Sequence, residues 1–230
     1  MRRLMKLEIK KFKLFSYVKG IVISNLAIMA MLCLVYFADK SEGRIPFESY
    51  EMAFGVIGSL VRGVFIIFAS VLIARIIIDE YRTKSITLLF MYPIKRQRMM
   101  AAKLALVAGF TFLTIFLSNI VIGTIFYAVD SYVHFVPKEL TGQVLGKNFL
   151  IMTLSAIACA GTSLVPLYFG MRKKSVPATI VAAILLVSFT NSSSNTSSLV
   201  FTIAIPIVLA LIGGFIAYLS IRNVEKADIT

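Results

Sequence analysis

The sequence predicts an all-α membrane protein with six transmembrane helices, and three observations lead to this prediction. Of its 230 residues, 59% are hydrophobic and only 15% are charged, whereas soluble domains average roughly 45–50% apolar and about 25% charged residues. The apolar residues gather in blocks close to the length of about 20 residues that a helix needs to cross a bilayer. Between these blocks, lysine and arginine are abundant on alternate sides only.

The first nineteen residues predict an amphipathic helix that lies in the membrane interface. At 3.6 residues per turn, its basic residues fall in one sector and most of its apolar residues fall opposite. A helix of this kind binds anionic lipid along the membrane surface, and it also offers a brace for a cytoplasmic partner. The anchoring residues are Arg2, Arg3, Lys6, Lys10 and Lys13. We therefore divide the chain into an interfacial elbow helix, 1–19, and a single transmembrane domain, 20–230.

Six apolar spans follow this helix. They cover residues 20–38, 52–78, 104–129, 148–171, 176–190 and 199–221. Pro166 and Pro206 predict kinks in the fourth and sixth spans. Both cysteines lie within spans, where we expect packing residues and no disulfide. As drawn, the spans contain no acidic residue.

The basic residues predict the orientation of the chain in the membrane. One set of connections carries eighteen lysine and arginine residues: 1–19, 79–103, 172–174 and 222–230. The alternate set carries four: 39–51, 130–147 and 191–198. By the positive-inside rule, both termini are cytoplasmic. The net charge of +13 is then mostly topological and does not indicate nucleic-acid binding.

The segment 79–96, between the second and third spans, predicts a short helix on the cytoplasmic face. Asp79 and Glu80 stand at its start, where acidic side chains favour the positive end of the helix dipole. Pro93 disfavours helical geometry at the residue before it and so ends the helix. Spacing of i, i+3 and i+4 makes one apolar ridge from Ile86, Leu89 and Phe90. Such a helix offers a soluble partner a surface on which to push.

This segment resembles the permease subunits of type-2 ATP-binding-cassette exporters. The resemblance rests on Glu, then Leu-Leu, then Pro-Ile-Lys-Arg, and then Lys103 at the start of the next helix. In that family the segment is the coupling helix, which docks in a cleft of the ATPase subunit. One departure is Lys84-Ser85, where family members often have Gly-Thr. The docking residues that the resemblance implies are Glu80, Ser85, Ile86, Leu88, Leu89, Phe90, Pro93 and Arg96.

A second group of residues is a candidate for the transport pathway or a subunit interface. Arg62 lies about ten residues into the second span, where a charged side chain tends to face a cavity or a partner. The alternative is that 49–62 lies along the outer interface, with Arg62 among the lipid head groups. Small residues on the fourth span allow close helix packing, within the subunit or between subunits. They are Ala156, Ala160 and Ser163.

Several enzyme classes are excluded by missing motifs. The chain has no Gly-x-x-x-x-Gly-Lys-Ser/Thr phosphate loop, so we expect ATP and Mg to bind a separate ATPase subunit. A single histidine cannot supply a two-histidine zinc site, and no Gly-x-Ser-x-Gly nucleophile elbow occurs. We therefore expect a chain that is not an enzyme and binds no cofactor or metal.

The resemblance implies the membrane subunit of an ATP-driven exporter in a bacterial cytoplasmic membrane. Two permease protomers, identical or paralogous, would stand above two ATPase subunits. The apolar, aromatic-rich composition favours a hydrophobic or amphipathic cargo, and small permeases of this type resemble exporters of bacitracin-like antibiotics, lantibiotics or peptide toxins. An alternative is a non-transporting immunity or assembly protein of the membrane. A secondary carrier is disfavoured, because such carriers often need an intramembrane carboxylate.

Overall fold

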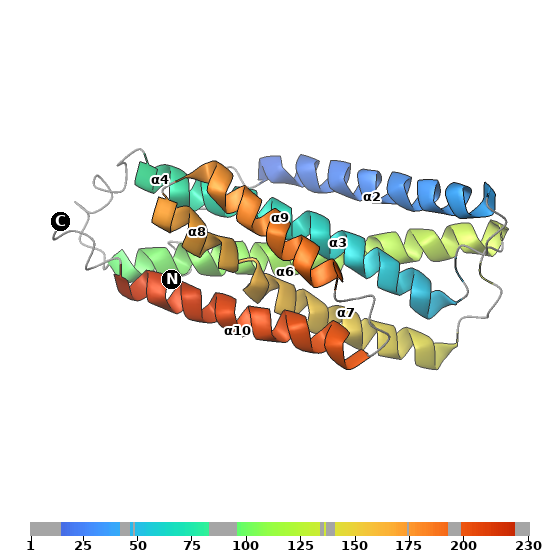
Figure 1. Ribbon diagram of the computed structural model, residues 1–230. Coiled ribbons are helices and arrows are strands. Elements are labelled where there is room, and N and C mark those ends of the chain that lie inside the picture. Colours follow the sequence, from blue (N-terminus) through green and yellow to red (C-terminus); the bar gives the residue numbers. More distant parts are fainter. Residues whose placement is uncertain are drawn as a thin grey trace.

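The protein is a bundle of long helices (Figure 1). Its computed structural model describes residues 15–41, 47, 49–82, 96–133, 136, 141–173, 175–192 and 199–223. Nearly all of these residues are helical and none is in a strand, which confirms the predicted all-α class. Within these residues, four helical stretches are long and apolar enough to cross a membrane, and two shorter apolar helical stretches accompany them. The count of six transmembrane helices stays a prediction.

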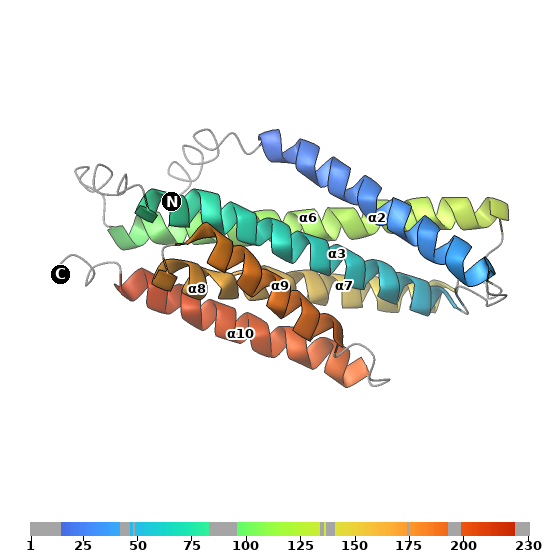
Figure 2. The same ribbon diagram turned by 45° about the horizontal axis from the view of Figure 1, so that its top comes forward.

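Successive long helices run in opposite directions along one common axis (Figures 1 and 2). The elements are α2 (Phe15–Ser41), α3 (Tyr50–Ile73), the π-helix η1 (Ala74–Ile78), α4 (Asp79–Arg82), α6 (Arg96–Val133), α7 (Gly142–Thr162), α8 (Val165–Lys173), α9 (Val176–Ser192) and α10 (Leu199–Asn223). α3 lies in the middle of the bundle and packs against α6, α7 and α9. α2 lies at the edge of the bundle in both views.

α3 begins at a conventional cap and then continues without a break into η1 and α4. The side-chain oxygen of Ser49 accepts a hydrogen bond from the backbone N–H of Met52, as an N-cap residue does. No glycine or proline follows between 64 and 82 to end the helix. α4 does start at Asp79, but the backbone before it is already helical. The sequence predicted that the acidic residues stand at a free helix start. They lie instead inside one continuous helical rod.

The fourth predicted span is divided into two helices. α7 ends at Thr162, and a turn at Ser163 and Leu164 separates it from α8. Pro166 is the second residue of α8, a position where its missing N–H removes no helical hydrogen bond. The kink predicted at Pro166 is thus a break just before it. The other predicted kink site, Pro206, lies inside α10.

The apolar surface of the bundle is divided between two internal clusters and the outside. One buried cluster includes Ile57 and Phe65 of α3, and the other includes Ile77 of η1. Many large apolar side chains remain outside, among them Leu34 at 69% and Leu211 at 70% exposure. Water would make this arrangement unfavourable, but lipid tails are as apolar as leucine. The exposed faces therefore suit a bilayer.

Candidate functional site

One end of the bundle gathers the basic residues at the ends of α4, α6, α8 and α10 (Figure 1). Arg82 ends α4, Arg96 begins α6 and Lys173 ends α8. Arg222 lies in the last turn of α10. We call this the basic end. The segment 83–95, which contains most of the predicted docking helix, lies in sequence between the end of α4 and the start of α6, and its own structure is outside the described residues.

A buried ion pair joins the two helices that flank this segment. Lys103 of α6 pairs with the carboxylate of Glu80 in α4, and the two side chains are only 4% and 9% exposed. The same ammonium donates a hydrogen bond to the backbone carbonyl of Ile76, at 3.2 Å. Taking such charges out of water is costly unless they are paired and further hydrogen-bonded. The arrangement supplies both, so α6 is fixed to η1 and α4 at one point.

The carbonyl that accepts from Lys103 belongs to Ile76, which lies in the π-helix η1. In a π-helix the backbone bonds run from i to i+5, and the register of the helix changes locally. Here the N–H of Asp79 donates to the carbonyl of Ala74 in this pattern. Such bulges are frequent at functional sites. η1 was not predicted, because the run Ala-Arg-Ile-Ile-Ile is compatible with an ordinary helix.

Close packing surrounds the ion pair. η1, α8 and α9 approach so closely at Gly170 that an added Cβ would lie 2.2 Å from Thr179 Oγ1 and 2.9 Å from Ile78 Cδ1. Buried apolar side chains from α3, η1, α6 and α8 fill the adjoining space: Leu72, Ile73, Ile77, Met100, Leu104 and Leu167. Movement at the basic end would therefore reach α3, α6, α8 and α9 together.

Several predicted residues lie outside the described part of the chain. They are the interfacial anchors Arg2, Arg3, Lys6, Lys10 and Lys13, and the docking residues Ser85, Ile86, Leu88, Leu89, Phe90 and Pro93. Of the predicted docking set, the structure describes Glu80 and the backbone of Arg96. It brings Glu80 to Lys103, which the resemblance had matched to a basic residue at the next helix start.

The opposite end of the bundle holds a buried polar contact that the sequence analysis missed. Asp130 is 5% exposed and accepts hydrogen bonds from the Tyr50 hydroxyl and, at 3.0 Å, from the backbone N–H of Val136. α6 extends to Val133 and so includes this acidic residue, whereas the predicted span ended at 129. An exposed ion pair, Lys147 with Glu51 at 3.0 Å, joins the beginnings of α7 and α3, which lie at the same end of the bundle (Figure 1).

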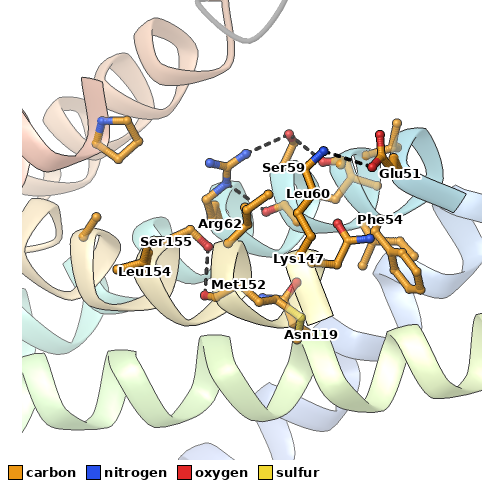
Figure 3. Close-up of a pocket in the computed structure, with 18 of the residues that line it drawn as sticks. Glu51, Phe54, Ser59, Leu60, Arg62, Asn119, Lys147, Met152, Leu154 and Ser155 are labelled. Carbon is orange, nitrogen blue, oxygen red and sulfur yellow. Dashed lines mark hydrogen bonds and ion pairs between the residues drawn. The ribbon is translucent and has the colours of Figure 1, made fainter. Parts of the chain in front are cut away.

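A cavity of about 540 Å³ lies between α3, α6, α7 and α10. Figure 3 shows Glu51, Ser59 and Arg62 along α3, and Lys147, Met152 and Ser155 along α7. Arg62 lies twelve residues after the first residue of α3, or about 18 Å at 1.5 Å per residue. α3 is continuous from Tyr50 to Ile73, so 49–62 forms no separate interfacial helix. Arg62 lines the cavity, and its depth in the membrane stays a prediction.

The small residues of the fourth span are buried inside the subunit. Ala156 and Ser163 are 0% exposed and Ala160 is 9% exposed. The closest helix approach in this region, however, is made by glycines that the sequence analysis did not select. A Cβ on Gly161 of α7 would lie 2.7 Å from Ala210 Cβ, and one on Gly213 of α10 would lie 2.1 Å from the Gly161 carbonyl oxygen.

Comparison with known proteins agrees with this architecture. The family described as "ABC-2 family transporter protein" matches residues 4–191. A protein of Bacillus subtilis (strain 168), "Uncharacterized protein YcbO", is 42% identical over 225 residues, which are 98% of this chain and 99% of that protein. No solved structure matches the chain. The match covers most of the chain and confirms the resemblance seen in the sequence: the chain belongs to the ABC-2 family of transporter proteins.

Proposed function

We propose that this chain is the permease subunit of an ATP-driven exporter, and that segment 83–95 is its docking site for the ATPase. Membership of the ABC-2 family makes the chain a membrane transport subunit and implies association with an ABC ATPase. The observation that carries the docking proposal is the buried Glu80–Lys103 pair. It joins the two helices from which segment 83–95 departs, so force applied to that segment passes into α3 and α6 together.

The basic end faces the cytoplasm in this proposal, and both termini lie there. The positive-inside rule supports this orientation. Contacts between helix ends agree with the predicted alternation: Glu51 pairs with Lys147 across two segments predicted to share the outer side. Glu80 pairs with Lys103 within the segment predicted to lie inside.

Two permease protomers, identical or paralogous, complete the transporter, and ATP with Mg binds the partner ATPase subunits. Closure of the ATPases would move the docking helices and tip the bundles between inward- and outward-open states, a rigid-body form of switching. The proposed cargo is a hydrophobic or amphipathic peptide. The apolar exterior of the bundle supports entry of such a cargo from the bilayer.

Substitution in the docking ridge tests the proposal. Leu89→Asp places a carboxylate in the ridge, while the matched control Met91→Asp places one on the opposite side of the same expected helix. The tagged chain is purified from its native membrane, and the ATPase that the proposal requires is sought among the co-purifying proteins. We expect Leu89→Asp, but not Met91→Asp, to abolish co-purification and stimulation of ATP hydrolysis. Equal behaviour of the two variants would refute docking through this ridge.

The cargo is tested separately on the reconstituted complex. We expect amphipathic peptides to raise the rate of ATP hydrolysis several-fold, and hydrophilic peptides of equal length to leave it unchanged. Stimulation by the hydrophilic peptides alone would contradict the proposed cargo class and leave the docking proposal intact.

A further inference from the structure

The cavity beside Arg62 has an unbalanced positive charge. Three charged side chains line it: Glu51, Arg62 and Lys147. Glu51 and Lys147 pair with each other at 3.0 Å, so their charges cancel locally. Arg62 has no ion pair with any residue in the described part of the chain.

Arg62 uses only part of its hydrogen-bonding capacity. Its Nε donates to the carbonyl of Gly58 and a terminal nitrogen donates to Ser59 Oγ, both at 3.1 Å. Both acceptors are neutral and belong to the same helix. A guanidinium carries five N–H groups and always keeps its charge, so three donors remain for a ligand. The amide nitrogen of Asn148, which also lines the cavity, is buried without an acceptor.

The remainder of the cavity lining is largely apolar, and the cavity is open volume that no side chain fills. Gly55 and Gly58 both line the cavity. A Cβ on Gly55 would meet nothing within 4 Å, and one on Gly58 would meet only Asn119 Oδ1, at 4.0 Å. These glycines therefore face open volume and not a neighbouring helix. The walls include Ile57, Leu60, Ile151, Met152, Leu154 and Ile207.

The cavity also has a volume and a length along α3 and α7 that suit an elongated molecule. Its volume of about 540 Å³ falls in the range of about 300–1,000 Å³ that is typical of ligand pockets. Glu51 and Arg62 are eleven residues apart on α3, and Lys147 and Ala158 are eleven apart on α7. At 1.5 Å per residue, the lined groove is about 16 Å long. Some of its lining residues are exposed, such as Met52 at 53% and Leu154 at 41%, so the groove opens to the outside of the bundle.

We propose that this cavity binds an anionic amphiphile, with its oxyanion head group on Arg62 and its apolar chain along the groove between α3 and α7. An isolated cation at this depth is costly, and an anion that accepts charge-assisted hydrogen bonds from the guanidinium offsets that cost. An apolar ligand would leave the charge unmatched. A free inorganic anion would leave the apolar walls unfilled. The inference does not depend on the proposed function, because the site lies within a single chain.

Thermal unfolding of the purified chain in an uncharged detergent tests the site. The probes are phosphatidylglycerol, phosphatidylcholine with the same acyl chains, and inorganic phosphate. A ligand that binds only the folded state raises the unfolding temperature as its concentration exceeds Kd. We expect phosphatidylglycerol to raise it, and the other two probes to have no comparable effect. Equal protection by the two lipids, or by phosphate alone, would overturn the proposal.

Two variants locate the binding. Arg62→Gln removes the charge and is expected to raise the half-saturating lipid concentration about tenfold or more, as the loss of a hydrogen bond to a charged group implies. Gly58→Leu keeps Arg62 but fills the groove, and we expect the same loss. Gly109→Leu is the control, because Gly109 is exposed on α6 with open space around it. If Gly58→Leu binds as tightly as Gly109→Leu, the groove is not the site, whether or not Arg62→Gln folds.

Discussion

Lys103→Met is the substitution whose effect on stability follows most directly from the structure. It removes the ammonium group and keeps a flexible apolar stem of similar length, so packing changes little. Glu80 then loses its cation at a site where its side chain is only 9% exposed. The Ile76 carbonyl loses its donor as well.

The expected loss is about 3–5 kcal/mol in the free energy of unfolding, the range for removing one partner of a buried ion pair. Coulomb's law gives a similar figure, because two unit charges about 4 Å apart attract by about 4 kcal/mol at an effective dielectric constant of 20. The double variant Glu80→Gln/Lys103→Met removes both charges of the pair. It should recover most of the loss, since replacing a buried pair by neutral groups is often nearly neutral.

The chain contains a matched control for this experiment. Lys147→Met breaks a second lysine–carboxylate pair, but its side chains are 48% and 51% exposed, and exposed pairs contribute about 0–1 kcal/mol. Unfolding of the purified proteins in detergent is followed by the loss of helical circular dichroism, because the chain has no tryptophan. If Lys103→Met costs no more than Lys147→Met, then the pair does not fix α6 to α4 and the argument for force transmission fails.

Two further predictions concern the helix contacts. Gly213→Ala places a Cβ where the Gly161 carbonyl oxygen would be 2.1 Å away, so we expect a loss of about 1–3 kcal/mol from overpacking; Gly214→Ala, which meets open space, should show none. Tyr50→Phe removes the hydroxyl that donates to buried Asp130, which should cost about 1–3 kcal/mol. Its control, Tyr132→Phe, changes a side chain that is 86% exposed and should stay within about 0.5 kcal/mol of the parent protein. Denaturant unfolding measures the free energy of unfolding of all four variants. If a control variant loses as much stability as the variant it is paired with, the predicted effect of that helix contact is contradicted.

Hydropathy located the helices well but not their ends. Five of the six predicted spans fall within continuous observed helices, and only the fourth is interrupted, by the turn at Ser163 and Leu164. Long apolar blocks are easily found, because burial in lipid selects them whatever their neighbours are. Asp130 was placed outside the third span, because a carboxylate lowers the local hydropathy. Only the tertiary structure shows the Tyr50 hydroxyl that satisfies it, from a residue eighty positions away.

Of the candidate site, the sequence predicted individual residues but not their partners. Glu80 was selected by its place in a family pattern, and Arg62 by the rarity of charge within a span. The partners of these residues depend on how α3, α6 and α7 pack, and no periodicity in the sequence encodes that. The glycines at Gly161 and Gly213 were missed because a glycine that permits contact and one that faces lipid look alike in sequence.

The walls of the Arg62 cavity come from distant parts of the chain, and this affects how the protein is made. α3 is synthesised early, whereas α7 supplies the facing wall about ninety residues later and α10 closes it with Pro206 and Ile207. In the proposed topology Arg62 would enter the bilayer without its α7 and α10 neighbours, at an insertion cost of about 2.5–3.5 kcal/mol for arginine at the helix centre. The strongly apolar residues on both sides of it in α3 would then have to offset this cost before the cavity exists.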